Sequence, residues 1–341
     1  MEIKREKLIE ILSIVKPGIA SKAIVDQATH FIFTGEQILT YDDRICICFP
    51  FETDFKGSVP GDEFYKIING MTGETISLSL DKGKLKFKCG NLRASLSMSP
   101  EDDIMAMVKV LNVPSLDSKQ WKNLPEGFAE GLFFCMFSAS KGGGQGKAFL
   151  NTLGVKEDAI VSSDSLRITR YFMKSPVEDS FLLPLSSVVE IVKLGKLSGY
   201  IAGSSWIHFK AESGVIFSSR VVAEEYPDVH SFFDFDSKEI ILPDDFKKSI
   251  DAVAILAPGE NEIDKTVDVV IENKTIKCRG EKEVGWIESD QKINYDGPKI
   301  SFLINPTFLI QILDKTKTMG YAEGKAVFVS DSFDHLVSLI V

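Results

Sequence analysis

The feature that most constrains this chain is an internal repeat of about 60 residues. Six segments share one design, in which a turn, usually with a proline, precedes an amphipathic helix that opens on an apolar anchor residue. The predicted helices, with their anchors, are Lys4–Ala20 (Leu8), Pro60–Met71 (Phe64), Pro125–Ala139 (Phe128), Pro184–Lys196 (Val188), Pro243–Ile255 (Phe246) and Pro306–Lys317 (Phe308). In five of the six, the proline falls in the turn or the first helical position, where its missing N–H costs nothing.

Alternating or continuous apolar runs of β type lie between these helices. They are His30–Phe33, Arg44–Phe51, Thr75–Leu80, Leu85–Cys89, Ala159–Phe172, Gly199–Phe209, Gly214–Val222, Thr266–Ile271, Thr275–Cys278, Ala326–Val329 and Leu336–Val341. Turn signals such as Asp81-Lys-Gly83 and Glu272-Asn-Lys274 separate neighbouring runs. Each repeat is therefore predicted to be a helix followed by several strands.

Two repeats together give about 115 residues, which is close to the commonest domain size. We therefore predict an α+β protein of three similar domains, 1–121, 122–236 and 237–341, each with two helices packed on antiparallel sheet. Segments rich in charged or small polar residues, Ser115–Leu124 and Tyr226–Glu239, mark the joints. The alternative is a two-domain α+β protein with accidental helix spacing, which the five near-equal intervals disfavour.

Composition and charge restrict the class of protein. The chain has 341 residues, 44% of them hydrophobic, and a formal net charge of −10, which is typical of a folded globular protein but not of one coated in nucleic acid. The apolar run Ile300–Leu313 is broken by Asn305-Pro306, so we expect no membrane partner, and the charged start suggests a cytoplasmic protein. The five cysteines lack paired metal-site spacing and are predicted to be buried, reduced thiols.

We find no catalytic or metal constellation in the sequence, and we expect no cofactor. The loop Ser140–Lys147 is rich in glycine, but it is one residue too short for a phosphate-binding loop and has Ala148 where the magnesium-binding hydroxyl would stand. The four histidines are far apart, and the neighbouring acids Asp42-Asp43 and Glu101-Asp-Asp103 are typical of solvated turns. The charges of the six predicted helices sum to zero, so charge alone does not predict DNA binding.

Several stretches resemble the bacterial sliding clamp, the beta subunit of DNA polymerase III, and they occur in the same order along the whole chain. They are Lys16-Pro-Gly-Ile-Ala-Ser-Lys-Ala23, Gly90-Asn-Leu-Arg-Ala-Ser-Leu-Ser97, Ala159-Ile-Val-Ser-Ser-Asp-Ser-Leu-Arg-Ile-Thr169, Glu225-Tyr-Pro-Asp228 and Val253-Ala-Ile-Leu256. The resemblance implies three tandem copies of the clamp domain and a head-to-tail homodimer whose ring encloses double-stranded DNA. It also implies a non-catalytic processivity factor that holds DNA polymerase and the clamp loader through short peptide motifs.

The resemblance also implies the site residues. DNA contacts are expected at Lys22, Lys66, Lys147, Phe149, Lys193, Lys196, Lys247, Lys248, Lys315 and Lys317, on inner helices, their ends or basic turns. A partner-peptide pocket is expected at Ser163, Ser165, Leu166, Arg167, Ile168, Val337, Leu339 and Val341, and the dimer contact at Ile255 and Leu256. Two departures stand out, since Ser165-Leu166 replaces the family's Gly-His and the tail lacks a Met-Pro-Met-Arg-Leu type ending.

Two other interpretations remain open at this point. One is a clamp-fold scaffold, for example of phage or plasmid type, that binds a different set of peptides. The other is a repeat-built β-rich hydrolase or carbohydrate-binding protein, which would need opposed acids or clustered exposed aromatic residues. A lysine on a helix is also about as often simply solvated as it is in contact with a phosphate.

Overall fold

The computed structural model describes residues 1–22, 26–100, 106, 109, 111–142 and 147–341. All six predicted helices form, as α1 (Arg5–Val15), α2 (Gly61–Gly70), α4 (Phe128–Cys135), α5 (Leu185–Ile191), α7 (Phe246–Val253) and α8 (Pro306–Leu313). Each is shorter than predicted. Four of them continue as a turn of 3₁₀ helix, namely η1 (Lys16–Gly18), η3 (Met136–Ser138), η6 (Val192–Leu194) and η7 (Ala254–Leu256). The six predicted anchors are all buried, with exposed fractions of at most 6%.

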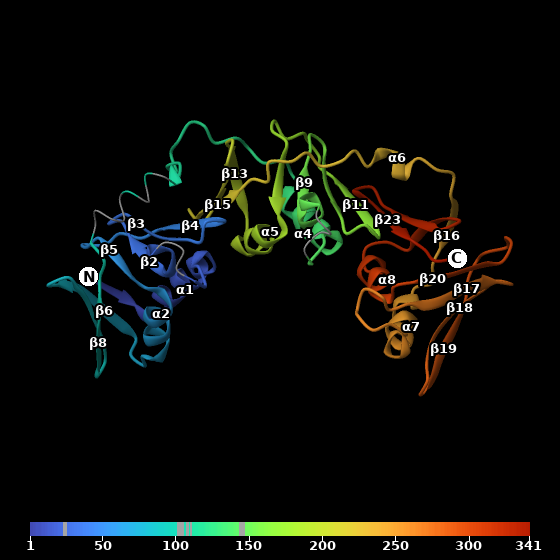
Figure 1. Cartoon of the computed structure of the whole chain (residues 1–341), viewed down its shortest axis with the longest axis horizontal. Helices are drawn as coiled ribbons and strands as arrows, with labels where there is room; N and C mark the ends of the chain where they lie inside the picture. Colours follow the sequence, from blue (N-terminus) through green and yellow to red (C-terminus); the bar gives the residue numbers. More distant parts are fainter. Residues whose placement is uncertain (23–25, 101–105, 107–108, 110, 143–146) are drawn as a thin grey trace. The chain divides into compact units, whose positions relative to one another are not determined.

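Three antiparallel strands follow every one of these helices (Figure 1). After α1 come β2 (His30–Phe33), β3 (Gln37–Tyr41) and β4 (Ile45–Pro50). After α2 come β6 (Thr75–Asp81), β7 (Lys84–Cys89) and β8 (Leu92–Ser97). After α4 come β9 (Thr152–Val155), β10 (Ala159–Ser163) and β11 (Arg167–Phe172). After α5 come β13 (Leu197–Ala202), β14 (Trp206–Ala211) and β15 (Ile216–Arg220). After α7 come β17 (Val267–Glu272), β18 (Thr275–Lys282) and β19 (Gly285–Lys292). After α8 come β21 (Thr318–Ala322), β22 (Lys325–Val329) and β23 (Phe333–Ser338).

A short strand precedes five of the helices. These lead strands are β1 (Glu2–Lys4), β5 (Gly57–Pro60), β12 (Phe181–Pro184), β16 (Lys238–Ile241) and β20 (Ile300–Ile304), before α1, α2, α5, α7 and α8. The fold is therefore α+β, and the predicted design of a helix followed by several strands is confirmed. Two of the predicted β-type runs, Ala159–Phe172 and Gly199–Phe209, are not single strands. Each is a hairpin of two strands, β10 with β11 and β13 with β14. The lead strands, β3, β9, β19, β21 and the small helix α6 (His230–Phe233) were not predicted as elements.

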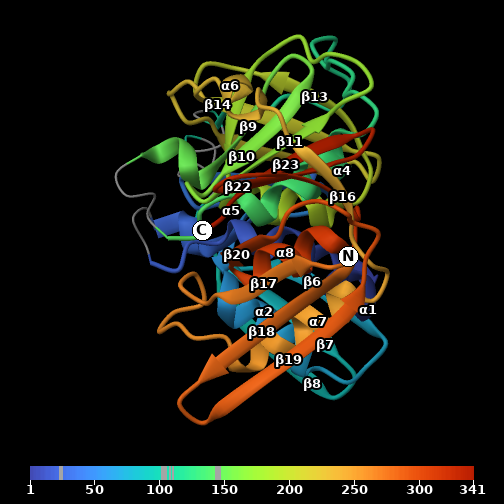
Figure 2. The ribbon, with the colours of Figure 1, turned by 90° about the vertical axis from the view of Figure 1, so that its right-hand side faces the viewer.

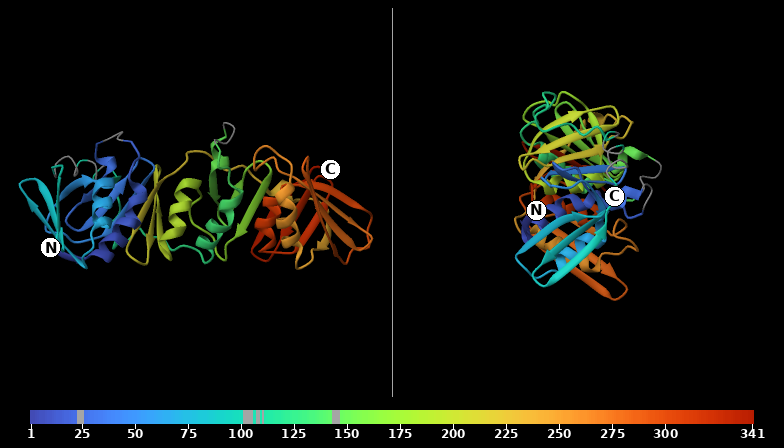
Figure 3. Two further views of the ribbon diagram at one scale, coloured as in Figure 1. Left: turned by 90° about the horizontal axis from the view of Figure 1, so that it is seen from below. Right: turned by 90° about the vertical axis from the view of Figure 1, so that its left-hand side faces the viewer.

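The chain divides into two compact units. The first comprises Met1–Ala129 and Phe181–Ala223, and the second comprises Glu130–Ser180 and Glu224–Val341. In the first unit, one sheet has the strand order β1-β6-β7-β8 and the other has the order β13-β14-β15-β4-β3-β2-β5. Helices α1 and α2 lie side by side in this unit (Figure 3). The pairing of β15 with β4 joins residues that are more than 160 positions apart in the sequence.

Phe64 of α2 links the two sheets of the first unit. Its ring centroid lies 6.1 Å from that of Phe31 and 6.2 Å from that of Phe33, both on β2, and 5.3 Å from that of Phe87 on β7. The four rings are almost completely removed from solvent, with exposed fractions of at most 2%. Burying a side chain of this size contributes roughly 2–3 kcal/mol, so the repeated anchor position stabilises the contact between helix and sheet.

In the second unit, one sheet has the order β19-β18-β17-β20, and α7 packs on β18 and β19 (Figure 2). The strands of the other sheet that belong to the second unit have the order β9-β10-β11-β23-β22-β21-β16. Gly280 on β18 allows a close approach, because a Cβ atom added there would lie 2.1 Å from the carbonyl oxygen of Val253 at the end of α7. Asn305 caps α8, since its side-chain oxygen accepts a hydrogen bond from the Thr307 amide at 2.9 Å.

Several sequence-based expectations have direct structural outcomes. All five cysteines are buried free thiols, as predicted. In the described part of the chain, no helix is long and apolar enough to cross a membrane. Residues 143–146 of the glycine-rich loop and the acidic segment 101–103 lie outside the described residues. The other acidic pair forms a turn, in which Asp42 accepts hydrogen bonds from the Arg44 and Ile45 amides.

Candidate functional site

A hollow of about 350 Å³ in the second unit brings together five of the eight predicted pocket residues. Ser163 ends β10, Ser165 and Leu166 form the following turn, and Arg167 and Ile168 begin β11. Because β10 and β11 are antiparallel and joined by this tight turn, their side chains meet at one end of the sheet. The local sequence thus builds one wall of the hollow from a single hairpin.

The C-terminal tail contributes the opposite set of side chains from the one predicted. Leu336 and Ser338 line the hollow, whereas Val337, Leu339 and Val341 do not. Neighbouring residues of a strand point to opposite faces of the sheet, so shifting the prediction by one residue exchanges every side chain that lines the hollow for one on the other face. Val337 and Leu339 are instead buried elsewhere in the core, and Val341 is 68% exposed at the end of the chain.

The remaining wall comes from the segment before and through α6 and from the start of η5 (Ala148–Asn151). It consists of Lys147, Phe149, Leu150, Tyr226, Pro227, Val229 and Phe232. Sequence reasoning missed most of these residues, although Tyr226 and Pro227 belong to the motif Glu225-Tyr-Pro-Asp228 that carried the resemblance. Phe149 packs edge-on against Tyr226, with ring centroids 5.5 Å apart. Burial raises the pKa of the Tyr226 hydroxyl, so this ring stays neutral.

The hollow is mainly apolar and partly open. Phe232 is 52% exposed and Leu166 is 38% exposed, although both are large apolar side chains. An exposed concave apolar surface with a few polar groups is the form that receives the anchor side chains of a peptide. Lys147 adds an exposed cation among the lining residues. The arrangement can therefore bind an apolar side chain and a nearby negative charge.

Arg167 holds the wall of the hollow together. Its Nε donates to Asp164 at 2.8 Å, its Nη1 donates to Gln311 of α8 at 2.5 Å, and its Nη2 donates to the carbonyl oxygen of Phe137. The guanidinium also lies 4.1 Å from the centroid of the Phe308 ring. Burial lowers the pKa of Arg167 and the Asp164 carboxylate opposes that shift, so the side chain remains a cation with its donors used inside the chain.

The predicted DNA-binding lysines fall into two groups. Five form ion pairs, in which Lys193 pairs with Glu190, Lys196 with Glu212, Lys247 with Asp314, Lys248 with Asp245 and Lys317 with Asp244. The hydrogen bond from Lys196 to Glu212 raises the pKa of Lys196, and that from Lys248 to Asp245 raises the pKa of Lys248. The positive charge of these five side chains is therefore partly offset by neighbouring carboxylates.

The other predicted lysines are exposed without such a partner. Among the described residues, Lys22, Lys66 and Lys147 form no ion pair, and Lys315 lies 6.0 Å from the centroid of the Phe134 ring. Lys22 follows η1, Lys66 lies on the solvent-exposed side of α2, and Lys147 precedes η5. These side chains keep their full charge for an external anion.

The two predicted dimer residues differ in exposure. Ile255 in η7 is 69% exposed, which is unusual for an isoleucine in a helical turn, and Leu256 is half-buried. Strands β8 and β19 form edges of the two four-stranded sheets and carry the exposed apolar side chains Leu92 (49%) and Trp286 (58%). Exposed apolar residues beside an unpaired strand edge mark a surface suited to association.

Two of the histidines are buried and share hydrogen bonds with hydroxyl groups on neighbouring strands. His335 is fully buried and shares one hydrogen bond, at 2.8 Å, with Thr169, which is also fully buried. His208 bonds Ser218 at 2.7 Å, and burial lowers its pKa to about 4. Within the described ranges, no group of histidine, cysteine, aspartate and glutamate side chains could hold a metal ion.

Solved structures that resemble this chain are bacterial sliding clamps. The DNA polymerase sliding clamp from Bacillus subtilis matches with a TM-score of 0.84 and 17% identity, over 100% of this chain and 98% of that one. The DNA polymerase III subunit beta from Pseudomonas aeruginosa bound to griselimycin matches with a TM-score of 0.83 and 15% identity, over 100% and 99%. A protein described as a putative DNA polymerase III beta subunit from Eubacterium rectale gives 0.83 and 16%, over 99% and 98%.

The sequence itself matches no family model and no curated protein. The structural match nevertheless extends over the full length of both partners in each comparison. The expected tandem clamp-domain architecture is therefore confirmed at the level of the fold: the chain has the fold of the DNA polymerase III beta subunit, the bacterial sliding clamp.

Proposed function

We propose that this protein is a non-catalytic sliding clamp, which encircles double-stranded DNA as a ring and tethers a polymerase for processive synthesis. The observation that carries the proposal is the match of the whole chain to sliding clamps with TM-scores of 0.81–0.84. A six-fold repeat of one helix with three strands is also suited to building a ring, because it multiplies a surface rather than converging side chains on one reaction centre.

The proposed domains are 1–121, 122–236 and 237–341. With these boundaries each domain contains two helix-and-three-strand repeats, led by α1 and α2, by α4 and α5, and by α7 and α8. The strand pairs β4–β15 and β11–β23 then join the middle domain to sheets of its two neighbours.

The proposed ring is a head-to-tail homodimer. A heterologous contact between two different ends of a chain closes into a ring when the rotation is complete. The surfaces that would meet are the edge of β8 in one copy and the edge of β19 with Ile255 and Leu256 in the other. Pairing these edges would satisfy their backbone groups and cover exposed apolar side chains.

The proposed peptide site is the apolar hollow beside Leu166 and Phe232, which would hold short motifs of the polymerase and the clamp loader in the cytoplasm. A labelled peptide with adjacent aromatic and aliphatic residues provides the test. We expect Leu166→Ala with Phe232→Ala to weaken its binding at least about tenfold, because truncating apolar anchors at a contact typically costs about 1–2 kcal/mol or more. Leu80→Ala on β6, comparably exposed but outside the hollow, is the matched control.

The central experiment combines solution mass with topology. The protein should have the mass of a dimer, remain on nicked circular DNA after loading, and leave when the circle is cut, since its affinity comes from enclosure. A stable monomer that is never trapped on circles would exclude the clamp function. Retention that survives linearisation would indicate tight direct binding and would equally contradict the proposal.

A further inference from the structure

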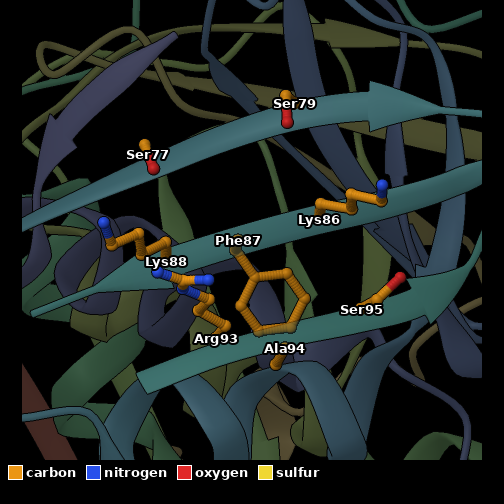
Figure 4. Close-up of a pocket in the computed structure, with 8 residues that line it drawn as sticks. All are labelled: Ser77, Ser79, Lys86, Phe87, Lys88, Arg93, Ala94 and Ser95. Carbon is orange, nitrogen blue, oxygen red and sulfur yellow. The ribbon is translucent and has the colours of Figure 1, made fainter. Parts of the chain in front are cut away.

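The outer face of the sheet β1-β6-β7-β8 carries an unusual charge arrangement. The inward residues of β6 and β7, such as Ile76, Leu78, Leu85 and Phe87, are buried toward α1 and α2. Serines and cations occupy most of the outward positions, together with the acids Glu2 and Asp81. The serines and cations, with Phe87 and Ala94, line a hollow of about 430 Å³ (Figure 4). Ser77 and Ser79 come from β6, Lys86 and Lys88 from β7, and Arg93 and Ser95 from β8.

The positions of these cations are unfavourable for the isolated sheet. Lys88 lies directly opposite Arg93 in the antiparallel register, and like charges in such cross-strand pairs are destabilising. Lys86 is paired with Asp81, but in the described part of the chain neither Lys88 nor Arg93 has an acidic partner. In Figure 4, the side chains of Lys88 and Arg93 lie together at one end of the hollow. Within a chain of net charge −10, this local excess of positive charge calls for an external anion.

The corresponding sheet in the second unit lacks this excess. On β18 and β19, Lys277 is opposite Asp290 and Arg279 is opposite Glu288. Lys277 also forms an ion pair with Glu288 at 3.1 Å, and Arg279 pairs with Glu281 at 3.0 Å. The outward cations of β18 and β19 are thus balanced by acids. On β6, β7 and β8, serine hydroxyls and further cations stand at most of the corresponding positions.

We propose that this basic face binds an acidic, extended peptide segment of a partner protein. Lys84, Lys86 and Lys88 alternate along β7, which spaces them about 7 Å apart, the same interval as alternate side chains of an extended peptide. A peptide carboxylate would meet Lys88 beside Arg93, and the carboxylate two residues along would meet Lys86, where it competes with Asp81. The serine hydroxyls would donate hydrogen bonds beside them. Among the residues that line the hollow, Phe87 is aromatic, but it is only 2% exposed and so offers little ring surface for the base stacking that single-stranded nucleic acid uses.

This surface is separate from the proposed peptide hollow, which lies in the second unit, and from the helices proposed to face DNA. It shares β8 with the proposed dimer contact, but that contact uses the backbone edge of β8 and not its outer face. The inference therefore does not depend on the clamp function. Its test uses a labelled twelve-residue peptide with glutamate at every second position, the same peptide with glutamine in those positions, and a thymidine oligonucleotide with an equal number of charges.

The decisive variant is Lys86→Glu with Lys88→Glu, which lies on β7 and not on the edge strand. Its matched control is Lys277→Glu with Lys282→Glu on β18, which changes the net charge equally on the corresponding strand. We expect the glutamate peptide to bind the wild-type chain, the glutamine peptide not to bind, and the β7 variant to lose at least about tenfold in affinity. The β18 control should change affinity less than about twofold.

Four results would overturn the proposal. They are no binding of the glutamate peptide, an equal loss in both variants, tighter binding of the oligonucleotide with loss in the β7 variant, and a change of solution mass in the β7 variant. The last two would assign the face to nucleic acid or to a second copy of the chain. If the β7 variant loses the glutamate peptide but is still retained on nicked circular DNA, the loss concerns the basic face and not the clamp function.

Discussion

Ser165 adopts a backbone conformation that few residues other than glycine tolerate. Its φ is +79°, and it occupies the turn between β10 and β11 that lines the hollow beside Leu166 and Phe232. Asp164 stabilises this turn by accepting hydrogen bonds from the Leu166 and Arg167 amides, each at 3.1 Å. The turn between β3 and β4 has the same construction, with Asp42 as the acceptor and Asp43 at φ +71°. The repeat is therefore visible even in single dihedral angles.

We predict that Ser165→Gly stabilises the chain by up to about 1 kcal/mol, because it removes the steric cost of a side chain at positive φ, partly offset by the greater freedom of glycine in the unfolded chain. The midpoint of urea unfolding would rise. Ser301→Gly, on the exposed face of β20, is the control and should lower the midpoint, since glycine weakens a strand interior. A lower midpoint for Ser165→Gly would contradict the strain argument.

His335 should make stability depend on pH. Burial, and then the nearby Arg167 charge, lower its pKa below the value of an unfolded histidine, so the native state holds it neutral. Below about pH 6.5, the unfolded state therefore binds more protons than the native state does, and stability falls as the pH falls. Above about pH 6.5, the contribution of His335 to stability is fully present. From pH 7.5 to 5.5 one such histidine removes roughly 1.4 kcal/mol.

The measurement is the difference in unfolding free energy between about pH 7.5 and about pH 5.5 for the wild type and for His335→Asn. The variant should lose about 1.4 kcal/mol less than the wild type over this range. Ser301→Asn, on the exposed face of β20, is the control, because it removes no titratable group, and it should leave the difference unchanged. Equal pH dependence in the wild type and His335→Asn would show that His335 is not held neutral.

At the scale of elements, the sequence predicted the helices better than the strands. The anchors Leu8, Phe64, Phe128, Val188, Phe246 and Phe308 were found because an apolar residue recurs at the start of each helix, in five of the six behind a proline, and all six are buried. Lead strands such as β1 and β5 have only three or four residues, too few to display a period of two. Their existence depends on pairing with β6 and β2, which are distant in the sequence.

The candidate site was predictable only where it is local. The Ser163–Ile168 wall belongs to one hairpin, so the motif located it, although the turn at Ser165 lacks the glycine that would have split the predicted strand Ala159–Phe172. The tail residues that line the hollow, Leu336 and Ser338, differ from those predicted for the site, because Leu336–Val341 is apolar on both faces and its pattern does not show which face is turned to the hollow. Lysine pairing with acids of other elements, as for Lys247 and Asp314, is a tertiary property that the sequence pattern does not contain.

Gly280 tests how closely α7 must approach its sheet. A methyl group there would meet the carbonyl oxygen of Val253 at 2.1 Å, and since that oxygen belongs to the backbone, the helix end must shift. We predict that Gly280→Ala destabilises the chain by roughly 1–3 kcal/mol, measured by thermal or urea unfolding. Gly70→Ala, at the end of α2 with nothing within 4 Å, is the control and should stabilise slightly. Similar effects at both positions would refute the packing argument.

At the scale of the whole molecule, a net charge of −10 and a proposed grip on DNA are compatible if the positive charge is local and weak. Half of the ten predicted DNA-binding residues are lysines already paired with carboxylates. Such a surface would hold DNA loosely, which suits a ring that must slide, since a strong phosphate grip would stop it. Enclosure, rather than affinity, would then provide the stability of the complex.

The two groups of lysines should therefore contribute unequally to DNA binding. We predict that Lys22→Glu with Lys66→Glu and Lys147→Glu weakens binding to linear duplex DNA and lowers the salt dependence of the binding constant, by about 0.9 in the log–log slope for each phosphate that the protein ceases to neutralise. Lys193→Glu with Lys196→Glu and Lys248→Glu changes the net charge equally but removes cations that neighbouring acids already offset, so its effect on the slope should be smaller. Solution mass is the control for intact assembly in both variants. Equal slopes for the two variants would mean that the ion pairs open when DNA is bound, and that all six lysines act as one diffuse positive field.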